Sequence, residues 1–250
     1  MLDHLSGGRL EIGFGRGSVP YEVSYYGQNA EERQQIYAER LELILKAFTA
    51  SILNWNGKYD QFENVPMEMA PLQKPHPPMW YGAHSPDSAE RAARKGLNIV
   101  TNDMPDKARA IVTRYREIWS ETTSRVLPKM GLVRFVVVAN TDADAMKIAR
   151  RAYLRWRSSF VHLFEAYGTK PDSPLNGESF DVLISQGQAM AGSPETVRAF
   201  LVEQIEQTGA NYIVGQFCFG DLSVGEMLRS VELFASEVMP ALRDSAGEKA

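Results

Sequence analysis

The sequence predicts an α/β fold in which parallel strands alternate with helices. Short apolar runs are followed by stretches of helical periodicity, and turn residues separate the two kinds of segment. Five strand and helix pairs in this order favour a parallel sheet covered by helices. A doubly wound sheet and a (β/α)8 barrel both satisfy the pattern. The barrel needs eight units, so at about 30 residues per unit the sequence would lack roughly 90 residues before Met1.

The first unit begins with an apolar strand at residues 10–14, after a helix end at residues 2–5 and a Gly7-Gly8 stop. The next helix is predicted from Asn29, which with Glu32 forms a variant of the capping box. Its apolar residues follow at helical spacing and are Tyr37, Leu41, Ile44, Leu45 and Phe48.

The second unit joins the short strand "MWYGA" to a helix with strong end signals. Ser85 is placed as the N-cap, Pro86 takes the first helical position, and Gly96 ends the helix. A third strand at residues 97–103 precedes a helix predicted from Pro105 to Thr123.

A fourth strand at residues 131–140 leads into a long helix opened by Thr141. Apolar residues three and four positions apart form one broad stripe on this helix. We interpret the stripe as a core face, with an interface to a second subunit as the alternative. Its members are Met146, Ala149, Tyr153, Trp156, Phe160, Leu163 and Tyr167.

Residues 168–192 are rich in glycine, proline, serine and asparagine, which predicts a mobile loop or an excursion over an active site. Ser193 then caps a helix, and the fifth strand, at residues 210–220, precedes a closing helix. Residues 1–243 are expected to form a single barrel domain, and residues 244–250 a polar tail.

Composition points to a small-molecule partner. The 27 basic and 31 acidic residues are intermixed, so no basic surface for nucleic acid or an anionic membrane is indicated. No apolar run approaches the ~20 residues of a membrane span, and the start does not resemble a signal peptide, so we expect a cytoplasmic protein. Cys218 is the single cysteine, and the four histidines lack metal-binding spacing, so no metal is expected.

The turn after the first strand is a candidate anion site. Gly13, Gly15 and Gly17 do not have the spacing of a dinucleotide-binding loop, but glycines allow a ligand to approach the backbone closely. Arg16 would lie at the carboxyl end of the strand, where its guanidinium suits a phosphate. The alternative is a tight turn in which Arg16 pairs with a surface carboxylate.

The start of the helix after "MWYGA" is a second candidate. Ser85 and Ser88 occupy the N-cap and third positions, where free N–H groups and hydroxyls can bind an anion, although the same residues also simply begin helices. His84 could contact a cofactor, act as an acid or base, or face solvent. Trp80 is a weaker candidate for stacking on a ring and could equally belong to the core.

Four segments resemble the luciferase-like monooxygenase family, the flavin-dependent (β/α)8 barrels related to bacterial luciferase. They are "LDHLSGGRLEIGFGRG", "QKPHPPMWYGAHSP", "AGSPETV" and "FGDLSVGEMLRSVELFASEVMPAL", and they occur in the family's order. The resemblance runs from Leu2 to about Arg243. It implies an α/β TIM barrel of the luciferase-like type, N-terminally truncated here to about five of its eight units.

The resemblance also implies site residues. Arg16, Ser85 and Ser88 fall on the family's contacts to the flavin phosphate, within a site to which Gly15 and Gly17 also belong. His84 stands where bacterial luciferase has a glutamate, so its role is open. A second family arginine falls at Gln34, and Arg33 is its neighbour.

In this family, reduced FMN from a separate reductase reacts with O2 to oxygenate a small organic substrate, whereas some relatives use F420 for hydride transfer. We therefore predict a flavin-dependent monooxygenase that forms a dimer. The alternatives are an F420-dependent oxidoreductase and a non-catalytic structural partner of a complete barrel. An incomplete barrel would expose unpaired strand edges and one apolar inner face.

Overall fold

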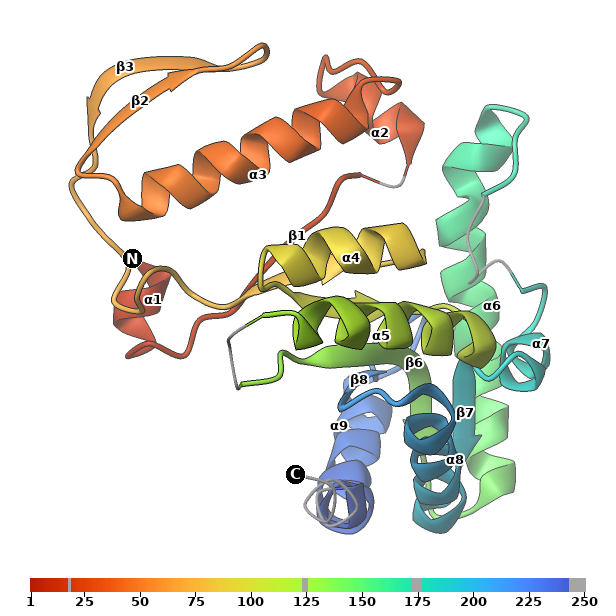
Figure 1. Cartoon of the computed structure of the whole chain (residues 1–250). Helices are drawn as coiled ribbons and strands as arrows, with labels where there is room; N and C mark the ends of the chain where they lie inside the picture. Colours follow the sequence, from red (N-terminus) through yellow and green to blue (C-terminus); the bar gives the residue numbers. More distant parts are fainter. Residues whose placement is uncertain (18, 123–125, 172–176, 243–250) are drawn as a thin grey trace. The chain divides into compact units, whose positions relative to one another are not determined.

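The computed structural model describes residues 1–17, 19–122, 126–171 and 177–242 (Figure 1). The chain divides into two compact units, residues 1–82 and residues 83–250. Both units contain parallel strands joined through helices, as the sequence predicts.

The first unit is built on two parallel strands. Strand β1 (Ile12–Phe14) follows the short helix α1 (Leu2–Leu5), and β4 (Met79–Gly82) lies beside it with Met79 opposite Ile12. Because the strands are parallel and in this register, both end at the same edge of the pair. The residues that follow β1 therefore emerge at that edge.

Helices α2 (Pro20–Tyr25) and α3 (Arg33–Thr49) follow β1. The capping box predicted at Asn29 is wrong. Helix α3 has Glu32 as its N-cap without a side-chain cap, and Asn29 Oδ1 instead accepts a hydrogen bond of 3.0 Å from the Glu31 amide. The Asn29 side chain therefore stabilises a local turn that lies three residues before the N-cap of α3, and does not cap the helix.

An antiparallel hairpin between α3 and β4 was absent from the predicted order of elements. Its strands are β2 (Ile52–Asn56) and β3 (Gln61–Pro66), and Trp55 pairs with Phe62 across them. The hairpin adds a two-stranded sheet to the first unit, separate from the pair formed by β1 and β4.

In the second unit, β6 (Met130–Val138) pairs in parallel with three strands: β5 (Asn98–Thr101), β7 (Ala189–Gly192) and β8 (Tyr212–Gln216). Gly131 is opposite residues of both β5 and β8, and Phe135 is opposite residues of both β7 and β8. Strands β5 and β7 therefore share one edge of β6 in succession, while β8 occupies the other edge.

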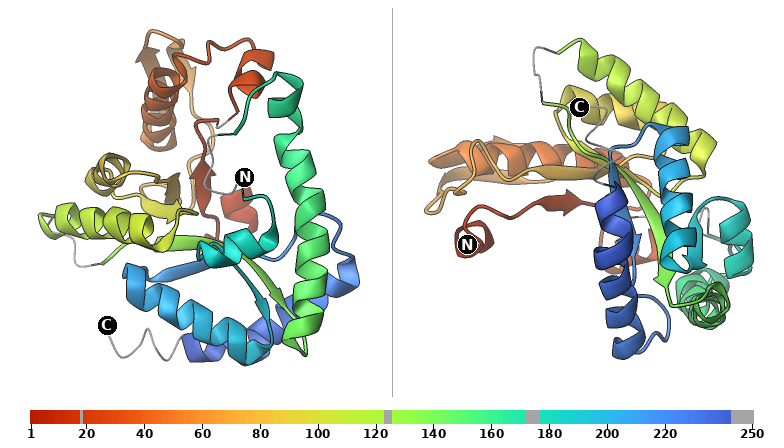
Figure 2. Two further views of the ribbon diagram at one scale, coloured as in Figure 1. Left: turned by 90° about the vertical axis from the view of Figure 1, so that its right-hand side faces the viewer. Right: turned by 90° about the horizontal axis from the view of Figure 1, so that it is seen from below.

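The helices of the second unit cover both faces of this sheet. Helices α4 (Pro86–Arg94), α5 (Pro105–Ser120) and α8 (Pro194–Thr208) pack in succession, and α8 also contacts the helix formed by α9 (Val224–Leu233) and η1 (Phe234–Val238). Helices α6 (Asp142–Ala166) and α7 (Phe180–Ser185) pack beside β7 (Figures 1 and 2).

Side chains alternate between two buried clusters along β6. Phe135 and Val137 pack with α6 and α7, whereas Val136 and Val138 pack with α8, α9 and η1. The stripe predicted on the long helix is largely a core face, since Ala149 and Tyr153 are buried and Met146 and Trp156 pack against the same cluster. The expectation of an exposed apolar sheet face is therefore wrong at β6, because α6 and α7 cover it.

The structure corrects part of the predicted loop at residues 168–192. Ser179 caps α7 by accepting a hydrogen bond from the Val182 amide, and β7 ends the segment. Residues 172–176 of the predicted loop, and the predicted tail at 244–250, lie outside the described residues. Helix α5 begins at Pro105 as predicted and ends at Ser120, and Thr123 is also outside them.

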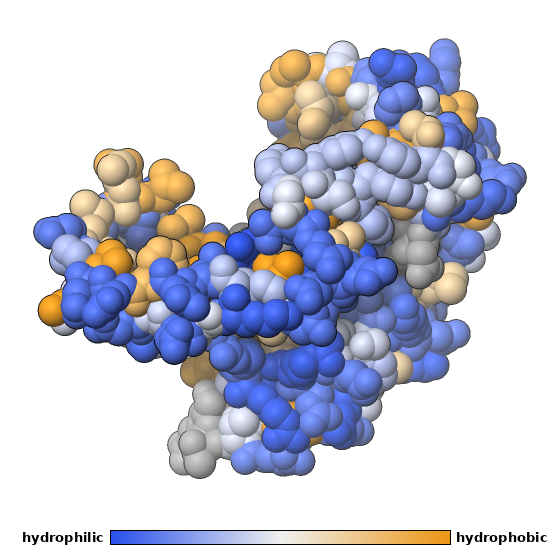
Figure 3. Space-filling view, turned by 90° about the horizontal axis from the view of Figure 1, so that it is seen from above, coloured by the Kyte–Doolittle hydropathy of each residue, from blue (hydrophilic) through white to orange (hydrophobic). Residues whose placement is uncertain are grey.

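The surface carries apolar side chains among polar ones. Figure 3 shows hydrophobic residues in several groups beside wide hydrophilic areas on one face. Among the described residues, no helix combines the length and the apolar character that a membrane crossing requires. Exposed large apolar residues include Ile52, Phe62, Met69, Val224 and Leu228.

Candidate functional site

Arg16 emerges from the turn that follows β1 in the first unit. Gly17 has φ +83°, and a Cβ at this position would lie 2.9 Å from Val23 Cγ2, so the turn requires glycine. Arg16 is exposed, and its Nη1 donates a hydrogen bond of 2.9 Å to Oε1 of Gln34. Gln34, which stands at the position of the second family arginine, is thus a neutral hydrogen-bond partner of Arg16.

Arg33 stands next to Gln34 and contributes a second cation. Its Nη1 donates to the Ala30 carbonyl at 3.3 Å. None of the described residues gives Arg16 or Arg33 a carboxylate partner. The expected alternative, in which Arg16 pairs with a surface acid, is therefore not found there, and the turn keeps a positive charge that can attract an anion.

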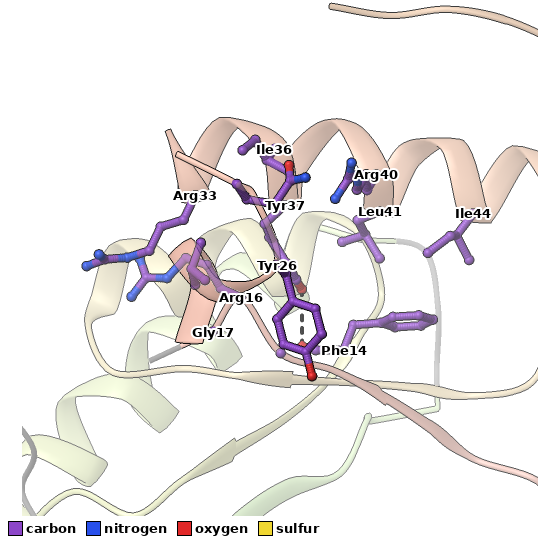
Figure 4. Close-up of a pocket in the computed structure, with 13 residues that line it drawn as sticks. Phe14, Arg16, Gly17, Tyr26, Arg33, Ile36, Tyr37, Arg40, Leu41 and Ile44 are labelled. Atoms are coloured by element: carbon purple, nitrogen blue, oxygen red, sulfur yellow. Dashed lines mark hydrogen bonds between the residues drawn. The ribbon is translucent and has the colours of Figure 1, made fainter. Parts of the chain in front are cut away.

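A pocket of about 380 Å³ lies beside these arginines, entirely within the first unit. Figure 4 shows Arg16 and Arg33 on the same side of it. A third cation, Arg40, is neutralised by Asp60 at 2.8 Å. The volume is within the range of pockets that hold small organic ligands. Apolar side chains on the lining are Phe14, Val23, Ile36, Leu41 and Ile44.

Tyr37 supplies a polar group to this pocket. Its hydroxyl donates to the Phe14 carbonyl at 3.4 Å, the interaction drawn as a dashed line in Figure 4. Burial, together with the neighbouring Tyr81, raises the pKa of Tyr37 to about 12. The phenol therefore stays protonated at neutral pH and acts as a hydrogen-bond donor rather than as a base.

Ser85 and Ser88 form a complete capping box at the start of α4 in the second unit. The Ser88 hydroxyl accepts hydrogen bonds from the backbone amides of His84 (3.0 Å) and Ser85 (2.9 Å), and donates its proton to the Ser85 carbonyl (2.7 Å). A contact from this hydroxyl to an anion would have to replace one of these bonds. Ser85 Oγ accepts from the Ser88 amide at 3.2 Å, and none of the described residues accepts the proton of this hydroxyl.

His84 follows β4 and is held by two interactions. Its backbone amide is bound to Ser88, and its ring Nδ1 lies 2.8 Å from Oδ2 of Asp103. The ring is about half exposed, while the Asp103 side chain is 2% exposed. Asp103 also accepts from Thr101 Oγ1 at 2.7 Å and from Lys107 Nζ at 2.8 Å. The solvent-facing loop histidine considered from the sequence is therefore anchored by a buried carboxylate.

The electrostatics keep Asp103 ionised. Burial acts to raise the pKa of this carboxyl, but the hydrogen bonds from His84, Lys107 and Thr101 outweigh burial and lower the pKa to about 2. An ionised carboxylate only accepts hydrogen bonds, so the donor in the contact with His84 is the ring nitrogen.

Arg134 is a buried cation near this carboxylate. It lies on β6 with its side chain fully buried, and both Nε and Nη2 donate to Oε1 of Gln204 at 3.0 and 2.9 Å. Burial lowers the pKa of Arg134 to about 10, and the negative charge of Asp103 acts in the opposite direction.

Sequence reasoning missed Asp103, Lys107 and Arg134. Asp103 directly follows a buried strand and precedes α5, which is where parallel α/β folds place functional side chains, so its position was a usable signal. Arg134 stands inside an apolar run, and an isolated charge in a buried strand was a second signal.

Aromatic side chains have defined contacts in both units. In the first, Trp80 on β4 donates from Nε1 to Glu11 Oε2 at 2.6 Å. In the second, Phe219 is buried against Phe135 with ring centroids 4.9 Å apart, and Phe217 meets Phe234 at the same distance. Phe217 and Phe219 are therefore packing residues.

Comparison with curated proteins identifies relatives over nearly the whole chain. A protein of Sinorhizobium fredii, y4wF, is 35% identical over 243 residues, which cover 96% of this chain and 70% of the relative. The oxygenase component of a flavin-dependent trigonelline monooxygenase from Acinetobacter baylyi is 29% identical over 263 residues, covering 98% of this chain and 71% of that protein.

Solved structures show the same fold. Monooxygenase RslO1 from Streptomyces bottropensis matches 96% of this chain and 70% of its own, with a TM-score of 0.81 and 25% identity. The oxygenating constituent of 3,6-diketocamphane monooxygenase from Pseudomonas putida, in complex with FMN, matches 96% of this chain and 73% of its own (TM-score 0.73, 20% identity). An F420-dependent tetrahydromethanopterin reductase from Methanopyrus kandleri matches 96% of this chain and 76% of its own, with a TM-score of 0.65 and 17% identity.

The family model described as luciferase-like monooxygenase matches residues 1–212, which include β1, Arg16, His84 and both serines of the capping box. The fold, the order of its elements and this match lead to one assignment. The chain belongs to the luciferase-like monooxygenase family.

Proposed function

We propose that this protein is the oxygenase component of a two-component flavin-dependent monooxygenase, which receives reduced FMN from a separate reductase and uses O2 to oxygenate a small organic substrate. The observation that carries the proposal is a pair of arginines beside an apolar pocket at the end of β1, neither of which has a carboxylate partner among the described residues. The trigonelline monooxygenase component supports the two-component arrangement.

The residues present fit the phosphate of a flavin. In the first unit, Arg16 and Arg33 offer charged donors to a phosphate. Gly15 has open space around it, so the backbone of the turn is accessible there, whereas Val23 occupies the place of a side chain on Gly17. In the second unit, the start of α4 is a separate candidate for an anion, where Ser85 offers a hydroxyl and Ser88 fixes the backbone of His84.

Bound reduced FMN would supply the electrons for reaction with O2. The chain's own contribution is to bind and orient. Arg16 and Arg33 neutralise the phosphate, while Phe14, Ile36 and Leu41 exclude water from the adjoining pocket. F420 also carries a phosphate, so the same cations suit it, and F420-dependent hydride transfer is the alternative.

Titration distinguishes these possibilities. The purified chain would be titrated with reduced FMN, oxidised FMN and F420 while fluorescence is followed. A charged hydrogen bond contributes about 1.5–3 kcal/mol, so Arg16→Ala should weaken binding of the correct cofactor by about 10-fold to 150-fold. Arg9→Ala is the matched control, because Arg9 is an exposed arginine of the same unit that does not line the pocket, and its guanidinium donates to the Ser6 carbonyl at 2.7 Å.

Each result has a definite meaning. Preferential binding of reduced FMN that is lost in Arg16→Ala and kept in Arg9→Ala supports the oxygenase. Preferential binding of F420 supports the hydride-transfer alternative. Absence of binding to all three would contradict both and favour the non-catalytic structural partner.

A further inference from the structure

We propose that one water molecule is an integral part of the second unit, bound between β5 and β7, where it donates hydrogen bonds to Asn102 and Gln188 and accepts from Arg134. The proposal starts from two buried side-chain oxygens, Asn102 Oδ1 and Gln188 Oε1, which accept no hydrogen bond from the described residues. Buried acceptors without a protein partner are rare and are commonly satisfied by ordered water. This site does not depend on the proposed function.

The two residues lie at a seam along one edge of β6. Strand β5 pairs with β6 up to Leu132, and β7 pairs with it from Phe135 onward. Asn102 directly follows β5 and Gln188 directly precedes β7, so both stand beside the short stretch of β6 that contains Arg134. Gln188 Nε2 donates to the Asn102 carbonyl at 2.7 Å, and this bond joins the two sides of the seam.

Helices α5 and α8 enclose the seam. Gln188 is fully buried, and the Oδ1 atom of Asn102 is buried as well. A Cβ on the neighbouring Gly187 would lie 2.7 Å from Pro105 Cγ, at the start of α5, and 3.3 Å from Gln204 Nε2 on α8. Bulk solvent therefore does not reach Gln188 Oε1, and a donor for this oxygen must be held inside the protein.

Arg134 supplies donors at the same seam. Nε and Nη2 donate to Gln204 Oε1, and Nη1 donates to the Val133 carbonyl at 2.8 Å. A guanidinium has five N–H groups, so one on Nη1 and one on Nη2 have no acceptor in the part of the chain that the structure describes. The Phe135 amide donates to the Gln188 carbonyl at 3.2 Å, which places Gln188 beside Arg134.

The chemistry of these groups selects water. The two oxygens require a donor and Arg134 requires an acceptor, so the occupant must do both. A metal cation or ammonium would suit the oxygens, but the buried guanidinium would repel it, since its pKa of about 10 keeps Arg134 charged at neutral pH. An anion would suit Arg134 but not the oxygens. A buried water typically makes about three hydrogen bonds, the number available here.

A direct hydrogen bond between the two side chains is the competing arrangement. The Gln188 amide cannot turn, because its Nε2 donates to the Asn102 carbonyl. The Asn102 amide has no such anchor among the described residues. If its NH2 group faced Gln188 Oε1, each side chain would satisfy the other and no water would be needed.

A high-resolution crystal structure of the unmodified protein tests the site directly. We expect one water at about 2.7–3.2 Å from both Asn102 Oδ1 and Gln188 Oε1, with a guanidinium nitrogen of Arg134 as its third neighbour. An Asn102 nitrogen within this distance of Gln188 Oε1, without a water, would overturn the proposal. A cation at the site, revealed by the anomalous scattering of rubidium after soaking in rubidium chloride, would also overturn it.

Oxygen-17 relaxation dispersion of the solvent counts long-lived internal waters in solution. Asn102→Leu keeps the size of the side chain and removes the acceptor, so the dispersion amplitude should fall by the contribution of one water. Gln207→Leu is the matched control, because Gln207 is an exposed amide that donates to Glu203, and it should leave the amplitude unchanged. A direct bond between Asn102 and Gln188 predicts no loss in either variant, so equal amplitudes would contradict the proposal.

Discussion

The buried guanidinium of Arg134 is bound to the neutral side chain of Gln204, which accepts two hydrogen bonds of 3.0 and 2.9 Å on one oxygen. Nη1 is occupied by the Val133 carbonyl at 2.8 Å. Arg134 thus has no carboxylate in direct contact among the described residues, and amide and carbonyl dipoles stabilise its charge. Such an arrangement makes Gln204 important for stability, because a buried charge that loses its partners is costly.

Gln204→Ala should therefore lower the free energy of unfolding by about 1.5–3 kcal/mol, the usual contribution of a hydrogen bond to a charged group. Urea denaturation measures the change. Gln207→Ala on the same helix is the control, since Gln207 is exposed and should cost no more than about 0.5 kcal/mol. In an Arg134→Met background the Gln204 substitution should cost clearly less, and equal costs in the two backgrounds would refute this account.

The lowered pKa of Asp103 predicts that the folded protein loses stability in acid. Its pKa falls from the ordinary 3.8 to about 2 in the folded chain, so its ionisation stabilises the fold fully above pH 4. The contribution, about 2 kcal/mol, is lost as the pH falls from about 4 to about 2.

Unfolding curves of the unmodified protein and Asp103→Asn at several pH values isolate this effect. The difference in free energy of unfolding should be constant between pH of about 5 and 7 and should shrink toward pH 2. A difference that does not change in this window would show that the pKa of Asp103 is not lowered.

Gly220 meets α6 so closely that a side chain cannot fit. Its φ is +60°, and a Cβ at this position would overlap the carbonyl oxygen of Ala152. Gly220→Ala should therefore cost about 2–4 kcal/mol or prevent folding, because backbone on both sides must shift. Thermal unfolding provides the measurement. Gly225→Ala is the control, because Gly225 lies in α9 with open space around it, and this change should be neutral or stabilising by up to about 1 kcal/mol.

Self-association is predicted through α9. Val224, Leu228 and Val231 are spaced by four and three residues on this helix and are 66%, 57% and 42% exposed. Sedimentation velocity should detect a dimer, and Leu228→Glu should weaken it at least 10-fold. Leu154→Glu is the control, since Leu154 is a similarly exposed leucine of α6. A monomer at all concentrations would contradict the predicted dimer.

Local signals explain what the sequence predicts correctly. Ser85, Pro86 and Gly96 define α4 because each acts on its own backbone, and the same holds for Thr141 and Ser193 at later helices. The hairpin β2–β3 was missed although Asn56-Gly57 between two short strands is a recognised hairpin signal. Strand β7, "AMAG", has no β-branched residue, and its pairing with β6 supplies what its own propensity lacks.

The candidate site shows a similar division. The turn with Arg16 and the helix start at Ser85 are contiguous in sequence, so spacing was enough to propose them. The contact between His84 and Asp103 is not, because 19 positions and a helix separate the two residues and only the fold brings them within 2.8 Å. A single sequence carries no record of such a contact.

The shared edge of β6 has a consequence for the dynamics of the second unit. Since β5 and β7 occupy successive stretches of one edge and β8 the other, neither edge of β6 can open without first displacing another strand. The central amides of β6 should exchange with deuterium only through global unfolding, whereas those of the two-stranded hairpin β2–β3 should exchange through local fluctuations. In the second unit, loss of β6 would therefore remove the pairing partner of β5, β7 and β8 together.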